Sequence, residues 1–559
     1  MHYALCERGG FMEAKKHLNK LVILIILSTL FFMAGNGILG LTNDNEVFYA
    51  QSAKEMMQHH TWLTPYLFGQ PQFEKPIFVY WVLRIGFEIF GVSNFSARFF
   101  PAIFGVLGVI AVYCLSALGF SDKRKAFLSG VVLASMGMYF GMAKTVFTDM
   151  VFTAFLFLSL LSFFWAYTKE NKKALGFVLF GVFCALAVLT KGPLGLILPG
   201  LAVLLFLICT KKIKFLFCWQ TLLGFFIFTA IAVPWYLLMI QKHGQDFVNE
   251  FFSNVNARRM VEAQHLSNDT WYFYPMTLIT SMFPWSLFVI TSICLLPYYL
   301  KRKENTLYLF LTCWIVVVFG LFEAAHSKVA NYIFPIFPAM AILIAGFIYD
   351  MQESKILKKI LFAITMGTVS IIALFPVAFC VSIFRFSNYI TNRVPIFCLI
   401  ALLITLVSVI LRFISKSKIV KAIYVFSLVV PVMFFTLLFS HSDFEGYISS
   451  EKICNYLMEN HKVGDTVISS RIFLRGVRYF TDKEVAMLDI PGKPFFSRHP
   501  IISLNSEDQL KEFLQKQPIT YCILKVSAVK DIENILSKGY RVTLLKTIGN
   551  SSVVKIEYL

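Results

Sequence analysis

Charged residues are scarce in this sequence. Asp, Glu, Lys and Arg make up 15% of the 559 residues, whereas hydrophobic residues make up 57% and aromatic residues 16%. In soluble globular domains about a quarter of the residues are charged, so this composition excludes a chain of ordinary soluble domains. The long apolar runs indicate a protein that crosses a membrane many times.

Three further features are missing. None of the 11 cysteines forms a CxxC pair, and most stand alone in apolar runs, so we expect no disulfide framework. There is no basic recognition helix or RNP-like strand, so the formal net charge of +19 does not indicate a nucleic-acid partner. The C-terminal region has no glycine-rich phosphate-binding loop. The excess of Lys and Arg therefore needs another explanation.

Loop charge gives that explanation. Thirteen apolar segments are long enough to cross a hydrocarbon core of about 30 Å. They lie near residues 21–41, 97–119, 126–143, 150–167, 174–190, 194–209, 215–240, 283–300, 305–323, 330–349, 360–382, 394–411 and 422–440. Six alternate short loops each carry three or four Lys or Arg, at 121–125, 168–173, 210–214, 301–304, 350–359 and 412–421. Because basic loops stay on the cytoplasmic side, we predict a cytoplasmic N-terminus.

An odd number of spans places the C-terminus and two longer loops, 42–96 and 241–282, outside the cytoplasm. We predict a polytopic α-helical membrane domain over residues 1–440 and a small extracytoplasmic α/β domain over residues 441–559, where strand-like and helix-like segments alternate. In the first loop, Val47–Gln58 and the aromatic stretch Pro76–Gly91 are expected to be interfacial helices along the outer leaflet.

Charged residues gather at the outer ends of the spans. They are Asp44, Glu46, Glu74, Lys75, Lys144, Asp149, Lys191, Arg258, Arg259, His326 and Lys328, and Tyr332 lies on the span that follows. Charge at membrane depth marks a functional site by default, although Lys and Arg at an interface also serve as anchors. Basic residues there suit phosphate, and a carboxylate among them can take a proton or orient a metal ion. The pattern favours an active site for a polyanionic substrate. A flippase or transporter of lipid-linked sugar, which would hold such groups near mid-span, is the alternative from another class.

Several motifs support an enzyme. The first outer loop contains Asn45-Glu46-x-x-Tyr49-Ala50, Glu55-Met56, Trp62, Pro65, Phe73-Glu74-Lys75-Pro76 and Tyr80-Trp81. Later segments are Thr148-Asp149, Leu189-Thr190-Lys191-Gly192, Val233-Pro234-Trp235, Arg258 or Arg259 before Trp271-Tyr272, and Ser327-Lys328-x-x-x-Tyr332-x-x-Pro335. As a set, over about residues 20–350, they resemble the bacterial GT-C glycosyltransferases, a superfamily that includes the aminoarabinose transferases of lipid A and the dolichyl-phosphate-mannose-protein mannosyltransferases.

The resemblance implies a GT-C fold and an enzyme of the bacterial inner membrane whose active site and C-terminal domain are periplasmic. Such an enzyme takes a sugar, for example 4-amino-4-deoxy-L-arabinose, from a polyprenyl-phosphate carrier and transfers it to lipid A or another envelope acceptor. A protein O-mannosyltransferase is the alternative within the superfamily. The implied partners are the carrier-linked donor, a lipid or protein acceptor and membrane lipids, with no nucleic acid. No cofactor is certain, and a divalent metal ion stays open.

The resemblance also implies roles for single residues. Members of the superfamily have a catalytic carboxylate at the position of Asn45, so we expect the neighbouring Asp44 to act here, with Glu46 as the alternate. Asp149 would orient a lysine or help to hold a divalent ion. The substrate and its phosphate would be bound by Glu74, Lys75, Tyr80, Lys191, Arg258, Arg259, Lys328 and Tyr332. With one base and no second nucleophilic carboxylate, inversion at the anomeric carbon is expected. The C-terminal domain either recognises the acceptor through Arg471, Arg475 and Arg478 or caps the cavity.

Overall fold

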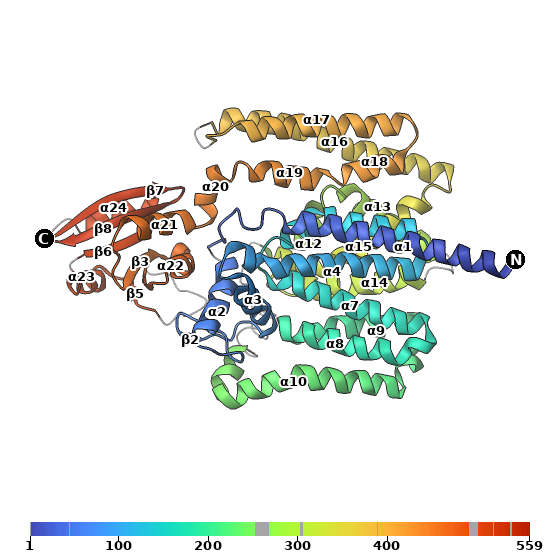
Figure 1. Ribbon diagram of the computed structural model, residues 1–559, viewed down its shortest axis with the longest axis horizontal. Coiled ribbons are helices and arrows are strands. Elements are labelled where there is room, and N and C mark those ends of the chain that lie inside the picture. Colours follow the sequence, from blue (N-terminus) through green and yellow to red (C-terminus); the bar gives the residue numbers. More distant parts are fainter. Residues whose placement is uncertain are drawn as a thin grey trace.

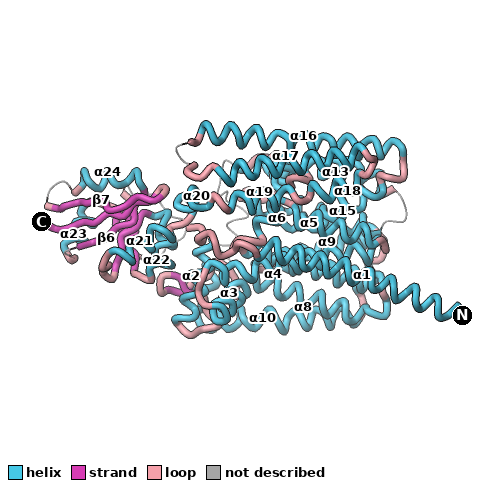
Figure 2. The backbone as a smooth tube through the Cα atoms, turned by 45° about the horizontal axis from the view of Figure 1, so that its top comes forward, coloured by secondary structure: helices cyan, strands magenta, loops and turns pink. Residues whose placement is uncertain are grey.

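The computed structural model describes residues 2–43, 45–251, 268–301, 306–387, 390–490, 501–517, 519–536 and 539–559. A helical bundle makes up most of the molecule, and a small sheet domain lies at one end of it (Figure 1). The two chain termini lie at opposite ends of the molecule, as Figures 1 and 2 both show.

Long apolar helices build the bundle, because a helix satisfies its own backbone hydrogen bonds and can therefore stand in lipid. They are α1 (His2–Met33), α4 (Asn94–Phe120), α7 (Thr148–Thr168), α8 (Lys173–Lys191), α9 (Leu194–Cys209), α10 (Trp219–Val248), α13 (Ser286–Leu300), α14 (Thr306–Glu323), α15 (Phe337–Asp350), α16 (Lys355–Arg385), α17 (Val394–Ser415), α18 (Ile419–Phe426) and α19 (Val429–Leu438). Within the described residues, nine helices are long and apolar enough to cross a membrane, and three shorter apolar helices accompany them. The polytopic helical fold is confirmed, and the count of thirteen spans stays a prediction.

One segment expected to be a single span consists of two helices. α5 (Lys123–Ser135) ends at Met136, whose backbone is extended, and α6 (Gly137–Met142) follows at once. The amide of Gly137 donates a hydrogen bond to the carbonyl of Phe283 at 2.8 Å. A neighbouring segment thus supplies the partner that a continuous helix would have provided, which is how a broken helix is tolerated at membrane depth.

The first outer loop folds against the end of the bundle that faces the sheet domain (Figure 1). It contains α2 (Glu46–Gln58), a short hairpin of β1 (Tyr66–Leu67) and β2 (Gln70–Pro71), and α3 (Phe78–Phe90). The expectation that α2 lies along a membrane surface is wrong, since ten of its 13 residues are buried. It packs between α3 and α22 (Leu474–Thr481) of the C-terminal domain. α3 keeps large apolar side chains exposed, among them Ile85 and Ile89.

The C-terminal domain is a six-stranded sheet in the order β5-β4-β3-β6-β8-β7. Its strands are β3 (Thr466–Ser470), β4 (Glu484–Leu488), β5 (Ser503–Leu504), β6 (Ile519–Lys525), β7 (Tyr540–Ile548) and β8 (Ser551–Tyr558). β3 to β6 are parallel, whereas β8 is antiparallel to β6 and β7. α20 (His441–Ile448) links the domain to the bundle. Within the bundle, α12 (Phe273–Ser281) precedes α13.

Helices cover both faces of this sheet. Successive side chains of a strand point to opposite faces, and here both sets are apolar, so each face has to be buried. Val467 and Ile523 belong to one apolar cluster with Leu457 of α21 (Glu451–Asn460) and Val477 of α22. Ile468 and Leu524 belong to a second cluster with Leu514 of α23 (Glu507–Gln515) and Ile532 of α24 (Val526–Ile535). The domain is therefore a three-layered α/β unit.

Candidate active site

The turn at residues 144–149 joins three parts of the molecule. Lys144 Nζ donates to the carbonyl oxygen of Ala34 at 2.7 Å and to Asn36 Oδ1 at 3.0 Å, both just after α1. The amide of Val146 donates to Glu46 Oε1 at 3.0 Å, which ties the turn to the first loop. Burial and the nearby Arg98 lower the pKa of the Lys144 ammonium to about 7. The end of α1, the start of α2 and the start of α7 thus meet at one point.

Asp149, at the start of α7, is the centre of a polar cluster. Its Oδ1 accepts a hydrogen bond from Lys191 Nζ at 2.5 Å, and its Oδ2 accepts one from Asn331 Nδ2 at 2.9 Å. The ring centre of Tyr332 lies 5.2 Å from Lys191 Nζ. Asp149 is only 3% exposed. Three predicted site residues from distant segments are therefore brought together, and Asn331 joins them.

This cluster has unused hydrogen-bonding capacity. Of the three N–H groups of the Lys191 ammonium, one is taken by Asp149, and the described residues provide no other acceptor for it. Asn331 Oδ1 and Ser327 Oγ are buried and have no partner among the described residues. Since buried polar atoms are nearly always paired in native proteins, the arrangement points to a polar ligand.

Glu46 is not part of the Asp149 cluster and forms a buried ion pair with Arg98. Its two oxygens accept hydrogen bonds from Arg98 Nε at 2.8 Å and Nη2 at 2.6 Å, and from the amides of Thr42 and Val146. Arg98 also donates to the carbonyl oxygens of Asn36, Leu39 and Gly40. The side chain of Glu46 has no exposed surface. This carboxylate therefore holds the loop that leads into α2 and has no oxygen left for a substrate.

Lys328 lies in the loop before η5 (Ala330–Ile336), on the same segment as Asn331. Its ammonium donates to Glu323 Oε1 at 2.7 Å and to the carbonyl oxygen of Thr270 at 3.0 Å. Glu323 Oε2 is buried and has no partner among the described residues. Lys328 thus fastens this loop to the segment before α12.

Tyr80 of α3 lies near three other first-loop residues, Tyr49, Gln72 and Glu74. Tyr80 is fully buried and its hydroxyl accepts a hydrogen bond from Gln72. Burial, together with the nearby Tyr49 and Glu74, raises the pKa of Tyr80 well above its usual value, so the phenol keeps its proton. Glu74 and Lys75 are half-buried in the turn before α3. Phe147, in the turn at residues 144–149, lies against Tyr49. The residues around Tyr80 therefore border the Asp149 cluster.

The sequence prediction missed residues that hold the first loop. Glu55 is buried and accepts hydrogen bonds from Gln51 and from the amides of Phe68 and Gly69. Arg98 gave a signal, because it is a basic residue at the outer end of a predicted span. Asn331 gave none, since it stands at an unspecified position between Lys328 and Tyr332.

Three predicted site residues, Asp44, Arg258 and Arg259, lie outside the described residues. Within the described part of the chain, no group of three His, Cys, Asp or Glu side chains is arranged to hold a metal ion. Both oxygens of Asp149 are engaged by nitrogen donors, which leaves this carboxylate poorly suited to a divalent cation.

Comparisons with known proteins agree with the fold. Residues 20–244 match the sequence profile of the dolichyl-phosphate-mannose-protein mannosyltransferase family. An uncharacterized protein of Aquifex aeolicus is 30% identical over 68% of this chain and 72% of its own length. The undecaprenyl phosphate-alpha-4-amino-4-deoxy-L-arabinose arabinosyl transferase of Edwardsiella ictaluri is 32% identical over 54% of this chain. The match spans 55% of that transferase, little more than half of its length.

Solved structures share the architecture. ArnT from Cupriavidus metallidurans, in its complex with undecaprenyl phosphate, superposes with a TM-score of 0.80 at 18% identity, over 96% of this chain and 97% of that one. The oligosaccharyltransferase of Archaeoglobus fulgidus gives a TM-score of 0.51 at 13% identity, over 93% of this chain and 71% of that one. At these identities the likeness establishes the fold.

Proposed function

We propose that this chain, whose residues 20–244 match the dolichyl-phosphate-mannose-protein mannosyltransferase family, is a membrane glycosyltransferase that transfers a sugar from a polyprenyl-phosphate carrier to an acceptor in the bacterial envelope. The names of the arabinosyl transferase relatives support undecaprenyl phosphate as carrier and 4-amino-4-deoxy-L-arabinose as sugar. The proposed acceptor is lipid A, and the proposed location is the inner membrane, with the site and the C-terminal domain in the periplasm.

The cluster around Lys191 is the observation that carries this proposal. Asp149 fixes the lysine and is itself held by Asn331, and the remaining N–H groups of Lys191 have no acceptor among the described residues and can bind a phosphate oxygen. In the reaction, an oxygen of the acceptor forms a bond to the anomeric carbon while the bond from that carbon to the carrier phosphate breaks. Negative charge then grows on the departing phosphate, and a preorganised ammonium stabilises it. Asp149 acts as a positioning residue for Lys191.

The unpaired oxygen of Asn331 suits a second task. A sugar hydroxyl can donate a hydrogen bond to this buried Oδ1, which would fix the sugar next to the phosphate. Asp44 is the proposed base that takes a proton from an acceptor hydroxyl. In the sequence it stands between Thr42, whose amide donates to Glu46, and Glu46 itself. An acceptor phosphate, as in lipid A, needs no such proton transfer.

The test is a transfer assay with purified protein in vesicles that contain undecaprenyl-phosphate-linked aminoarabinose and lipid A. We expect glycosylated lipid A and free undecaprenyl phosphate in equal amounts. Lys191→Met should lower kcat/KM about 100-fold or more, because it removes one electrostatic contact to the leaving group. Lys172→Met is the matched control, since this exposed lysine stands beside the opposite end of α8 and should leave the rate unchanged.

Two further readouts separate the alternatives. A protein O-mannosyltransferase would instead transfer mannose from a polyprenyl-phosphate carrier to a Ser or Thr peptide, so this donor and acceptor form the second arm of the assay. NMR of the product gives the anomeric configuration, for which we expect inversion. No transfer in either arm would refute the proposed function, and retention would refute the one-step mechanism.

A further inference from the structure

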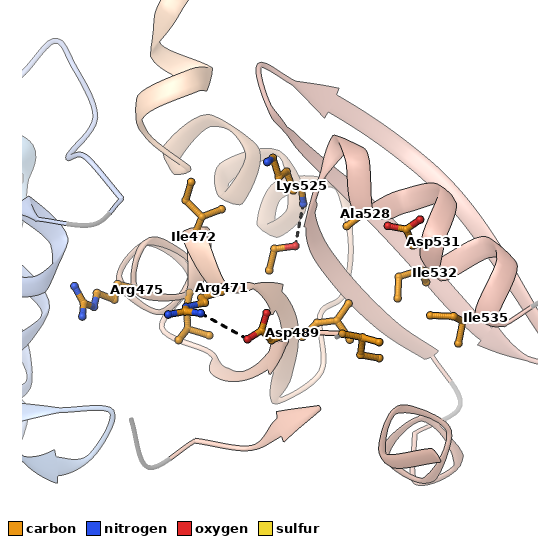
Figure 3. Close-up of a pocket in the computed structure, with 13 residues that line it drawn as sticks. Arg471, Ile472, Arg475, Asp489, Lys525, Ala528, Asp531, Ile532 and Ile535 are labelled. Carbon is orange, nitrogen blue, oxygen red and sulfur yellow. Dashed lines mark hydrogen bonds and ion pairs between the residues drawn. The ribbon is translucent and has the colours of Figure 1, made fainter. Parts of the chain in front are cut away.

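A pocket lies within the C-terminal domain, far along the chain from the site described above. It has a volume of about 470 Å³ and opens at the carboxyl ends of the parallel strands. Ser470 ends β3, Asp489 follows β4, and Lys525 ends β6 (Figure 3). Its size falls within the range of about 300–1,000 Å³ that is usual for small-molecule sites.

The topology of the sheet places this pocket where ligands bind in open α/β sheets. From β3 the chain continues through α22 to β4 and then to β5 on one side, whereas β6 pairs with β3 on the other side. The strand order therefore reverses between β3 and β6. The connections leave in opposite directions there and open a crevice outside the carboxyl ends. The amide of Lys525 donates to Ser470 Oγ at 3.0 Å across this boundary.

The lining combines an apolar wall with an excess of positive charge. Ile532 and Ile535 of α24 form one side of the pocket (Figure 3). Three cations, Arg471, Arg475 and Lys525, and two carboxylates, Asp489 and Asp531, are among the lining residues. The described residues place no ion-pair partner next to the Lys525 ammonium. Arg471 and Asp489 are 3.7 Å apart, which is longer than a hydrogen bond.

From these observations we infer that the pocket binds a phosphate-bearing sugar. Arginine and lysine bind phosphate oxygens, Asp531 can accept hydrogen bonds from hydroxyls, and the isoleucines can pack against the apolar face of a sugar ring. A free sugar phosphate and the headgroup of a phosphorylated glycolipid share this chemistry. If the proposed function holds, on which this step rests, the glycolipid is the acceptor of the sugar.

One residue connects the pocket to the first loop. Arg475 lines the pocket, and its guanidinium carbon lies 4.8 Å from the ring centre of Phe48 on α2. α2 begins at Glu46, directly after the segment that contains the proposed base. The side chain of Arg475 therefore belongs both to the lining of the pocket and to the contact with the first loop. This position suits the recognition of an acceptor.

The test measures binding to the full chain in phosphatidylcholine nanodiscs by calorimetry. One arm titrates glucose 1-phosphate, with glucose as the uncharged control, and the other arm compares nanodiscs with and without lipid A. We expect binding in at least one arm, and we expect Lys525→Ala to weaken it about tenfold or more through the loss of a charged hydrogen bond. Lys530→Ala, an exposed lysine of α24 that does not line the pocket, should bind like the wild type.

The outcomes separate the pocket from the active site. Binding to glucose 1-phosphate alone identifies a free sugar phosphate, and binding to lipid A alone identifies a headgroup. If Lys191→Met abolishes all binding and Lys525→Ala leaves it intact, the phosphate binds only in the active site and the inference is overturned. Absence of binding in both arms overturns it as well. A failure of sugar transfer would refute the proposed function. The titrations would still show whether the pocket binds a phosphate-bearing sugar.

Discussion

Replacement of Arg98 by Met should destabilise the packing of the first loop against the bundle. The guanidinium of Arg98 is 5% exposed and contacts both oxygens of Glu46, which has no exposed surface. It also donates to three carbonyl oxygens between α1 and α2. Met keeps most of the side-chain volume and removes all five donor contacts. The carboxylate of Glu46 is then left buried with only the amides of Thr42 and Val146 as donors.

The burial of this ion pair sets the expected loss in the free energy of unfolding. Removal of one partner from a buried ion pair costs about 3–5 kcal/mol, because the other charge stays uncompensated away from water. In the double variant Arg98→Met with Glu46→Gln, that charge is gone, so the loss should be smaller than the sum of the two single losses, with a coupling of about 0.5–3 kcal/mol. Arg124→Met is the matched control. Arg124 pairs with Asp122 at 3.0 Å and is exposed, so its loss should cost about 1 kcal/mol or less.

The assay is equilibrium unfolding in mixed detergent micelles, followed by tryptophan fluorescence, for the wild type and these variants. Sugar transfer is measured in parallel, and we expect the rate of Arg98→Met to fall with the loss of loop structure. An unfolding midpoint for Arg98→Met equal to that of Arg124→Met would refute the reasoning. So would strict additivity in the double variant, because the two side chains would then be energetically independent.

Three further predictions concern other contacts. Asp149→Asn should lower kcat/KM about 10- to 100-fold through the loss of the charge that fixes Lys191, and an unchanged value would contradict the positioning role. Burial lowers the pKa of Lys144 to about 7, so the unfolded chain binds more protons above that pH; the melting temperature of the wild type should therefore rise relative to Lys144→Met between pH 7 and 9, and a constant difference would contradict this burial. Gly476→Ala should cost about 1–3 kcal/mol in the same unfolding assay, because a Cβ would lie 2.1 Å from Ser450 Oγ and 2.6 Å from Asn43 Oδ1; wild-type stability would show that α22 does not pack closely on this loop.

Hydropathy and loop charge predicted the helical fold, because the need to satisfy the backbone in lipid leaves few alternatives to a helix. They did not predict the break at Met136, since the carbonyl of Phe283 that pairs with Gly137 belongs to a distant segment. The burial of α2 was also not predictable. Its pattern is amphipathic, and an amphipathic helix can be covered by a membrane surface or by another domain. Asp482 and the carbonyl oxygen of Tyr479, both on the C-terminal domain, hold Lys54 of α2, and no local signal indicates this docking.

Three members of the candidate site were predictable from the sequence, whereas Asn331 and the pairings between the side chains were not. The outer ends of spans identified Asp149, Lys191 and Tyr332, because charge next to lipid is costly and therefore informative. Which carboxylate pairs with which base depends on how the helices pack, and hydropathy carries no information on that. Glu46 illustrates the limit, since its partner Arg98 stands 52 positions away at the outer end of another predicted span, and nothing in either segment indicates that the two side chains meet.

The most direct test of the central claim is mass spectrometry of envelope lipids from cells that produce either the wild-type protein or Lys191→Met at equal levels. The account predicts a glycosylated lipid species, with the mass of one sugar added, in cells with the wild-type protein and its absence in cells with the variant. The same species at equal abundance in both would contradict a role for the Lys191 cluster in transfer. Its absence from both would contradict the proposed activity.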